Sequence, residues 1–255
     1  MHKTVDMPLP TLSFVTGVSQ WDVLLQNLAW SPCLQKGQLE WSAVSNAASA
    51  AHAFNPAMTA AEQLAPSNHW LVWAHQDVYL PQGWDLKFAS ELQEAVSRWP
   101  KLAVAGVYGV SGFGPKIIRS GHVLDRGKDL HEPTPLPALT DSLDELLVAV
   151  KVGSRLRMDP ALGFDFYGTD LVLQAKQQGM QAWVAGHHLK PVSGCRIPLQ
   201  DGLDVFLKSI HAMSLSGMQA KTGSTLTLED SLNIRQKAPQ KLHLVLIDLR
   251  PIPEP

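Results

Sequence analysis

The stretch HWLVWAHQDVYLP, residues 69–81, contains a compact apolar run that ends abruptly in three polar residues. Its centre, LVWA, is short and apolar throughout, a pattern typical of a buried strand. His75, Gln76 and Asp77 follow directly, at the predicted end of that strand. Ligands of α/β proteins bind at the carboxyl ends of parallel strands. The stretch therefore predicts a buried strand and, at its end, the place of a functional site.

Strand-like apolar runs and helical patterns alternate on either side of this stretch. Further strands are predicted at residues 12–18, 39–44, 101–110, 142–153 and 181–188. Helices are predicted at residues 21–30, 46–65, 85–99 and 168–179. Residues 111–139 are rich in Gly and Pro and predict loops with a small hairpin around residues 117–123. The alternation indicates βαβ units, so the expected fold class is α/β with a mostly parallel central sheet flanked by helices.

The composition disfavours several classes of partner. The chain has 255 residues, 45% of them hydrophobic, and a formal net charge of -2 from 21 basic and 23 acidic residues. This balance gives no field that would attract nucleic acid or an anionic membrane. Cys33 and Cys195 lack the spacing of a zinc site or a disulfide framework, which favours a reducing cytoplasm. We see no export signal, and the apolar runs are shorter than the ~20 residues that span a bilayer, so we expect a cytoplasmic protein without a transmembrane segment.

Several acids and histidines are candidates for chemistry, and each has a structural alternative. Asp77 at a strand end can bind a metal or a phosphate, although a single acid at this place more often caps a loop. Asp170 opens a predicted helix, where the helix dipole alone is sufficient reason for an acid. His187 and His188 end the last predicted strand and can add an imidazole to a metal site, although an unpaired histidine is more often a surface or core residue. Only their joint occurrence indicates a site.

Five segments occur in an order that is specific as a set. They are SNAASAAHAFNPAM, HQDVYLPQGW, AVAGVYGVSG, LDELLVAVK and FDFYGTDLVLQAKQQG, the last followed by His187. This ordered set, over roughly residues 11–195, resembles the glycosyltransferase family 2-like domain found in streptomycin-biosynthesis-associated proteins. The resemblance implies a GT-A-like fold, a nucleotide-diphosphate sugar as donor, and Mg²⁺ or Mn²⁺ as cofactor. It also implies a glycosyltransferase-like domain over residues 1–200 and an extension of unassigned role over residues 201–255.

The resemblance also implies roles for residues on the donor side. The positions similar to the nucleotide-binding loop and the polar donor-side residues are Thr16, Gly17, Val18, Asn46, Ser49 and Asn55. HQD takes the place of the usual DxD motif, so Asp77 is similar to the metal-binding aspartate. His75 replaces the first acid of that motif, and an imidazole can bind manganese or contact a phosphate. Gln76 lies between them on the donor side, and His187 or His188 corresponds to a late metal-binding histidine.

On the acceptor side, Asp170 matches the acid of the family's later acidic block, which implies a base or an acceptor-binding residue. Asp144 corresponds to a boundary of the acceptor site. Tyr167 and Gly168 replace a Glu-Asp pair that is common in the wider superfamily. The main expectation is therefore metal-assisted transfer of a sugar from a nucleotide-diphosphate donor to an unknown acceptor. The alternatives are a protein that binds the nucleotide sugar without turnover, or a scaffold.

Overall fold

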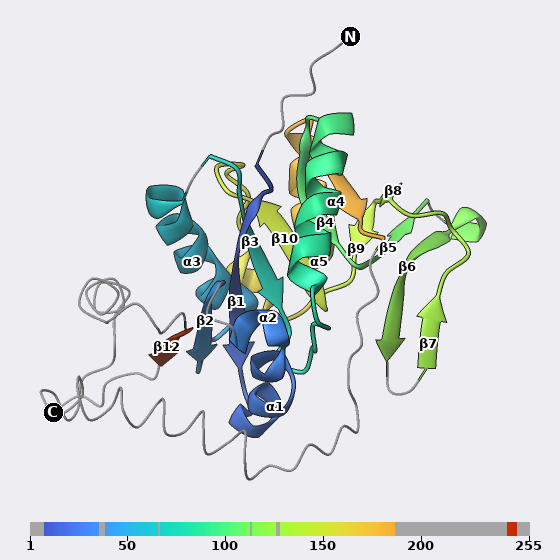
Figure 1. Cartoon of the computed structure of the whole chain (residues 1–255). Helices are drawn as coiled ribbons and strands as arrows, with labels where there is room; N and C mark the ends of the chain where they lie inside the picture. Colours follow the sequence, from blue (N-terminus) through green and yellow to red (C-terminus); the bar gives the residue numbers. More distant parts are fainter. Residues whose placement is uncertain are drawn as a thin grey trace, which may run out of the picture.

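The computed structural model describes residues 8–35, 39–65, 67–112, 114–125, 128–186 and 244–248, which form two sheets and the helices around them (Figure 1). The larger sheet has the strand order β12-β2-β1-β3-β10-β4-β11-β8. Its strands are β1 (Thr11–Val18), β2 (Glu40–Ser45), β3 (His69–Ala74), β4 (Leu102–Gly106), β8 (Ala138–Leu139), β10 (Leu147–Lys151), β11 (Gln181–Val184) and β12 (Leu244–Asp248).

The central strand β3 forms where the apolar run LVWA predicts it, and every residue of it is buried. It lies between β1 and β10, in the middle of the sheet. The neighbouring apolar runs give β1, β2, β4, β10 and β11 near their predicted positions. A strand with neighbours on both edges and helices on both faces has no solvated side, which is why LVWA shows no alternation of polar residues.

The prediction of a GT-A-like, mostly parallel central sheet is wrong, because the sheet is mixed. Four of its pairings are parallel, and three are antiparallel: β10 with β3, β10 with β4, and β8 with β11. After β4 ends at Gly106 the chain builds the second sheet, adds β8 beside β11, and comes back to the carboxyl end of β4 at Leu147. The strand β10 therefore runs in the opposite direction to β3 and β4. The run LLVAV is apolar throughout, and an apolar run predicts a buried strand without indicating its direction.

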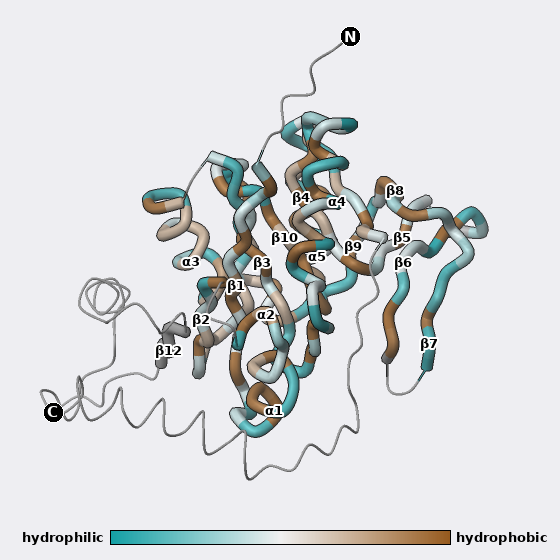
Figure 2. The backbone as a smooth tube through the Cα atoms, in the orientation of Figure 1, coloured by the Kyte–Doolittle hydropathy of each residue, from teal (hydrophilic) through white to brown (hydrophobic). Residues whose placement is uncertain are grey.

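The second sheet is antiparallel throughout, with the order β7-β6-β5-β9. It contains β5 (Tyr108–Ser111), β6 (Ile118–Asp125), β7 (Lys128–His131) and β9 (Ser142–Leu143). The small hairpin predicted around residues 117–123 is displaced: those residues lie almost entirely in the single strand β6, which pairs with the later strand β7. In Figure 2 the strands β3, β4 and β10 of the larger sheet are mainly white to brown, whereas β7 of the second sheet is mainly teal.

Helices cover both faces of the larger sheet. They are α1 (Trp21–Gln26), α2 (Pro32–Gln35), α3 (Ala50–Leu64), α4 (Trp84–Arg98) and α5 (Tyr167–Gln177), with short 3₁₀ turns η1 (Leu28–Trp30), η2 (Gly114–Lys116) and η3 (Pro160–Leu162). Alternate residues of β1 face opposite layers. Phe14 belongs to the buried cluster that includes residues of α1 and α4, with an edge contact to Trp84 at 6.3 Å between ring centroids, while Val15 belongs to the cluster that includes residues of α3 and α5.

A segment from the expected extension joins the larger sheet, because the strand β12 pairs in parallel with β2. The expected boundary at residue 200 lies outside the described residues and stays a prediction. Within the part of the chain that the structure describes, no helix has both the length and the apolar character needed to cross a bilayer.

Candidate functional site

The order of the first three strands creates a reversal point in the sheet. From β1 the chain adds β2 on one side, and it then crosses to the other side of β1 to add β3. Both pairings are parallel, so the carboxyl ends of β1, β2 and β3 lie at one edge. Open α/β sheets bind ligands outside the strand ends at such a point. The segment His75–Gln76–Asp77 begins there, directly after β3.

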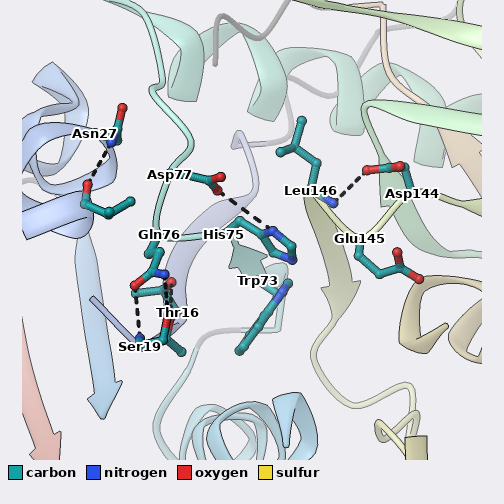
Figure 3. Close-up of polar contacts among 12 residues, drawn as sticks. Thr16, Ser19, Asn27, Trp73, His75, Gln76, Asp77, Asp144, Glu145 and Leu146 are labelled. Atoms are coloured by element: carbon teal, nitrogen blue, oxygen red, sulfur yellow. Dashed lines mark hydrogen bonds and ion pairs between the residues drawn. The ribbon is translucent and has the colours of Figure 1, made fainter. Parts of the chain in front are cut away.

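The start of β10 lies at the same edge. The backbone N–H of His75 donates to the carbonyl of Leu146 at 3.0 Å, because β10 runs antiparallel to β3. Asp144 and Glu145 immediately precede this contact. Figure 3 shows the Asp77 carboxylate directed toward the imidazole of His75, and Asp144 directed toward the backbone of Leu146. The mixed sheet therefore gathers acids from two strand connections at one place.

Tyr167, the first residue of α5, links these segments through its hydroxyl. The indole Nε1–H of Trp73 donates to that hydroxyl at 2.8 Å, and the hydroxyl donates to the carbonyl of Glu145 at 2.9 Å. Nε2 of His75 lies 2.6 Å from the same oxygen. Tyr167 is almost fully buried, and its burial raises the pKa of its hydroxyl well above the usual range. A neutral phenol therefore joins β3, α5 and the segment before β10.

His75 and Asp77 form the exposed part of this arrangement. Their side chains are 39% and 61% exposed, and Nδ1 of His75 lies 3.9 Å from Oδ1 of Asp77. Burial lowers the pKa of His75, and the nearby carboxylates of Asp77 and Asp144 oppose that shift only in part. The imidazole is therefore uncharged at neutral pH, with one nitrogen in contact with Tyr167 and the other on the side of Asp77.

Gln76 has a structural role. Its side-chain oxygen accepts hydrogen bonds from the backbone N–H groups of Ser19 and Gln20, at 3.0 and 3.1 Å, and its amide nitrogen donates to the Ser19 hydroxyl at 2.7 Å. These bonds hold the connection after β1 against the connection after β3. The contact of Gln76 with a donor stays a prediction, and its internal contacts shape the site.

The acid pair Asp144–Glu145 lies between β9 and β10. Asp144 is exposed at the edge, and its carboxylate accepts a hydrogen bond from the backbone N–H of Leu146 at 2.9 Å. Burial raises the pKa of Glu145, and the negative charge of Asp144 raises it further, while the backbone N–H of Phe166 acts in the opposite direction. Sequence reasoning missed Glu145 and the hydroxyl of Tyr167. The signal for Glu145 was its place beside Asp144, directly before an apolar run.

The three residues expected at the nucleotide-binding loop are part of β1 itself. Thr16 and Val18 are buried in the strand, and the Thr16 hydroxyl donates to the carbonyl of Gly17 at 3.3 Å. A Cβ atom at Gly17 would lie 3.2 Å from the ring of Trp73 and 3.4 Å from that of Phe164, so a side chain at this position would press on both rings. The exposed residues of this connection are the next two, Ser19 and Gln20.

The expected donor-side residues Asn46, Ser49 and Asn55 are not gathered into one set of contacts. Asn46 is exposed after β2 with φ 57, at the same edge as His75. Ser49 caps α3, since its hydroxyl accepts the N–H of His52 at 3.4 Å. Asn55 holds the backbone of Met158 with two hydrogen bonds, each of 2.9 Å. All three have partners within the protein, since the amide of Asn46 donates to the Ser45 hydroxyl at 3.4 Å.

Asp170 lies in the first turn of α5, and its carboxylate accepts the amide of Gln174 at 2.6 Å. That same amide donates to the carbonyl of Arg157 at 2.8 Å, so Asp170 belongs to the contact between α5 and the segment before η3. The role expected for Asp170 near an acceptor stays a prediction.

The expected cation site is present only in part among the described residues. Asp77 lies at the edge as expected, but His187 and His188 lie outside the described residues. In the described ranges, no three His, Cys, Asp or Glu side chains are grouped closely enough to hold a metal ion by themselves. At this edge, the described part of the chain brings two possible metal-binding atoms near each other, Oδ1 of Asp77 and Nδ1 of His75.

Comparisons with known proteins leave the family open. No family model and no curated protein matches the chain. Among solved structures, the crystal structure of A197 from STIV is similar over 69% of this chain and 81% of its own, with 13% sequence identity and a TM-score of 0.42. A similarity at this level carries no argument about function.

Proposed function

We propose that the chain binds a nucleotide-diphosphate sugar at the reversal point between β1 and β3 and transfers the sugar to an acceptor hydroxyl. The observation that carries the proposal is the convergence of Asp77, His75, Asp144 and Glu145 at one edge of the sheet, beyond the ends of β1 and β3. Ligands of such sheets bind at this place, and transfer of a sugar needs both a cation-binding side and a proton acceptor.

On the donor side, Asp77 and His75 are the groups that fit a cation bound to a diphosphate. Mg²⁺ in nucleotide sites is usually held by one or two carboxylates together with substrate phosphates, so a complete protein ligand set is not required. Asp77 offers an exposed carboxylate, and Nδ1 of His75 lies 3.9 Å from it. Bound Mg²⁺ or Mn²⁺ supplies positive charge that stabilises the departing diphosphate. Without it, the carboxylates of Asp77 and Asp144 would repel that diphosphate.

On the acceptor side, Glu145 is the proposed proton acceptor, because burial and the negative charge of Asp144 raise its pKa. In the proposed step the acceptor hydroxyl gives its proton to the carboxylate of Glu145. The oxygen of the acceptor hydroxyl bonds to the anomeric carbon of the donor while the bond from that carbon to the diphosphate oxygen breaks. The electron pair of that bond leaves with the nucleoside diphosphate.

A donor screen tests the proposal. Thermal unfolding is followed with UDP, GDP and dTDP sugars, with and without Mn²⁺, since a ligand that binds the native state raises the midpoint. We expect one nucleotide series to raise the midpoint in the presence of Mn²⁺, and donor hydrolysis by the wild type to exceed that of Asp77→Ala. If no sugar nucleotide changes the midpoint, the proposal is wrong.

A second candidate is a protein that binds the nucleotide sugar without turnover, and the surroundings of Gly168 favour it. A Cβ atom at Gly168 would lie 2.5 Å from the carbonyl oxygen of Leu143, so no acid fits where the resemblance places one of the Glu-Asp pair. The other position is Tyr167, whose hydroxyl is engaged inside the protein. Donor binding without hydrolysis or transfer, measured over a range of acceptors, would favour this candidate.

A further inference from the structure

We propose that Tyr167 holds His75 in the tautomer with its proton on Nε2, and that Nδ1 of His75 and the Asp77 carboxylate form a two-donor site for a divalent cation. This inference deepens the proposed function, because that cation is the one that would accompany the donor diphosphate. Tyr167 is a positioning residue in this site, since it acts on the cation through His75.

The tautomer follows from the hydrogen-bonding capacity of one hydroxyl. A phenol has one proton to donate and two lone pairs that accept. The indole of Trp73 can only donate, and the carbonyl of Glu145 can only accept, so the Tyr167 proton is directed to Glu145. The second lone pair then faces Nε2 of His75 at 2.6 Å, and it requires a proton on that nitrogen. Nδ1 of the neutral ring therefore carries the lone pair.

The surrounding contacts keep the ring in this orientation. Trp73 and Tyr167 are 2% and 1% exposed and pack edge to face, with ring centroids 5.6 Å apart. The backbone of His75 is fixed by its hydrogen bond to Leu146. Metal-binding histidines commonly donate their second N–H to an oxygen that fixes the tautomer and makes the binding nitrogen a better donor. The Tyr167 oxygen supplies that partner here.

The spacing of the two donors suits a shared ion. Typical metal distances of ~2.1 Å to an imidazole nitrogen and up to ~2.2 Å to a carboxylate oxygen place two ligands of one ion at most ~4.3 Å apart. Nδ1 of His75 and Oδ1 of Asp77 are 3.9 Å apart, within that limit. The Asp77 side chain is largely exposed and free to adjust its rotamer. No third protein donor is grouped with these two in the described ranges, which leaves the other coordination positions to water or phosphate.

The test uses the full chain, without nucleotide. Histidine side-chain ¹⁵N spectra are recorded at alkaline pH, where imidazoles are neutral, and Mn²⁺ is then added as a paramagnetic probe. For His75 we expect a protonated Nε2 and an unprotonated Nδ1, and selective broadening of its signals by Mn²⁺. His69 is the internal control, because both of its ring nitrogens contact hydroxyls, of Thr11 and Ser13, at 2.7 and 2.8 Å.

Three variants separate the parts of the proposal. Asp77→Asn should keep the tautomer and lose the Mn²⁺ broadening at His75. Tyr167→Phe should give mixed tautomers and weaken Mn²⁺ binding roughly 10-fold or more, as loss of such a partner does in other metal sites. Tyr108→Phe is the matched control, because it removes another hydrogen-bonded tyrosine hydroxyl, in the second sheet, and should change neither measurement.

A wild-type His75 with its proton on Nδ1 would overturn the inference, and so would broadening that Asp77→Asn leaves unchanged. These two results do not depend on whether Tyr167→Phe folds. A selective Mn²⁺ effect at His75 together with no binding of any sugar nucleotide would leave the inference standing and contradict the proposed function.

Discussion

The hydroxyl of Tyr167 lies 2.6 Å from Nε2 of His75, although 92 positions separate the two residues in the chain. The contact connects the end of β3 to the start of α5, and through Glu145 to the start of β10. Three elements that meet at the carboxyl edge therefore share one buried hydrogen-bonded group. Changes inside this network should alter the site, and changes in the contacts around it should alter stability alone.

Glu145→Gln should lower the rate of sugar transfer by about 10²- to 10⁴-fold, the usual contribution of a positioned proton acceptor. Donor affinity should change little, because the proposed donor contacts are those of Asp77 and His75. Initial rates and donor titrations measure the two effects separately. Glu94→Gln, on the exposed face of α4, is the control. Equal rates for Glu145→Gln and the wild type would remove Glu145 from the proposed step.

Asn55→Ala should destabilise the protein by about 1–3 kcal/mol, because it leaves the backbone N–H and carbonyl of Met158 without their partners. Asn55→Asp should also be destabilising, since it retains the acceptor for the N–H of Met158 but places a carboxylate oxygen against the Met158 carbonyl. Urea unfolding measures both values. Donor affinity of the folded variants should equal that of the wild type; a large loss of affinity would restore Asn55 to the donor site that the resemblance implies.

Gln76→Ala should cost about 1–2 kcal/mol of stability, because two backbone N–H groups and one hydroxyl lose their hydrogen bonds. It should also increase amide hydrogen exchange at Ser19 and Gln20, which report on the connection after β1. Gln82→Ala, at an exposed position before α4, provides the comparison. Unchanged exchange at Ser19 and Gln20 would show that Gln76 does not hold this connection.

Gly168→Ala should destabilise the fold by about 1–3 kcal/mol, the usual cost of an extra methyl group in a tightly packed place. The new Cβ would lie 2.5 Å from the carbonyl oxygen of Leu143, and a backbone atom moves aside only with difficulty. Gly186→Ala is the matched change, because its Cβ would meet the flexible carboxylate of Glu91 at 3.2 Å. Thermal unfolding of the two variants should rank them in that order.

Stability should fall as the pH decreases below about 6.5, the ordinary pKa of histidine. Burial lowers the pKa of His69, and the charge of Glu40 opposes this only in part. Between the lowered folded value and 6.5 the unfolded chain binds more protons, so the contribution is complete above 6.5 and is lost on acidification. His69→Gln should reduce the slope of unfolding free energy against pH in this window. A steeper slope in the variant would show that the sign is wrong.

The strands were predictable because each contains a short, continuous run of apolar residues. LVWA gives β3 and LLVAV gives β10, but the direction of β10 depends on the path of the chain between Gly106 and Leu147. The path of this segment depends on the strand pairings of the second sheet. The residues that pair there show no periodic pattern in the sequence. Local patterns therefore predicted the elements and missed the mixed character of the sheet.

The candidate site was predictable only for residues whose place in the fold follows from their position after a strand. Asp77 follows a buried strand, and its exposed place at the edge is confirmed. Ser49, Asn55 and Gln76 are residue types that bind ligands, cap helices and hold loops equally well. Which of these they do depends on partners such as Met158, which lies 103 positions from Asn55. Glu145 was missed because its raised pKa comes from burial, which the residue itself does not reveal.

The antiparallel strand β10 also bears on how the molecule assembles. In the described sheet it joins β3 on one side to β4 on the other, so the parallel groups β12-β2-β1-β3 and β4-β11 meet through it. Closing the chain segment from Gly106 to Leu147 is therefore a long-range step, and such steps slow folding. Asp144 and Glu145 reach the edge beside His75 when β10 is inserted. A chain in which β10 is not yet inserted has the ends of β1 and β3 without Asp144 and Glu145 beside them. Donor turnover would therefore report that the sheet is complete.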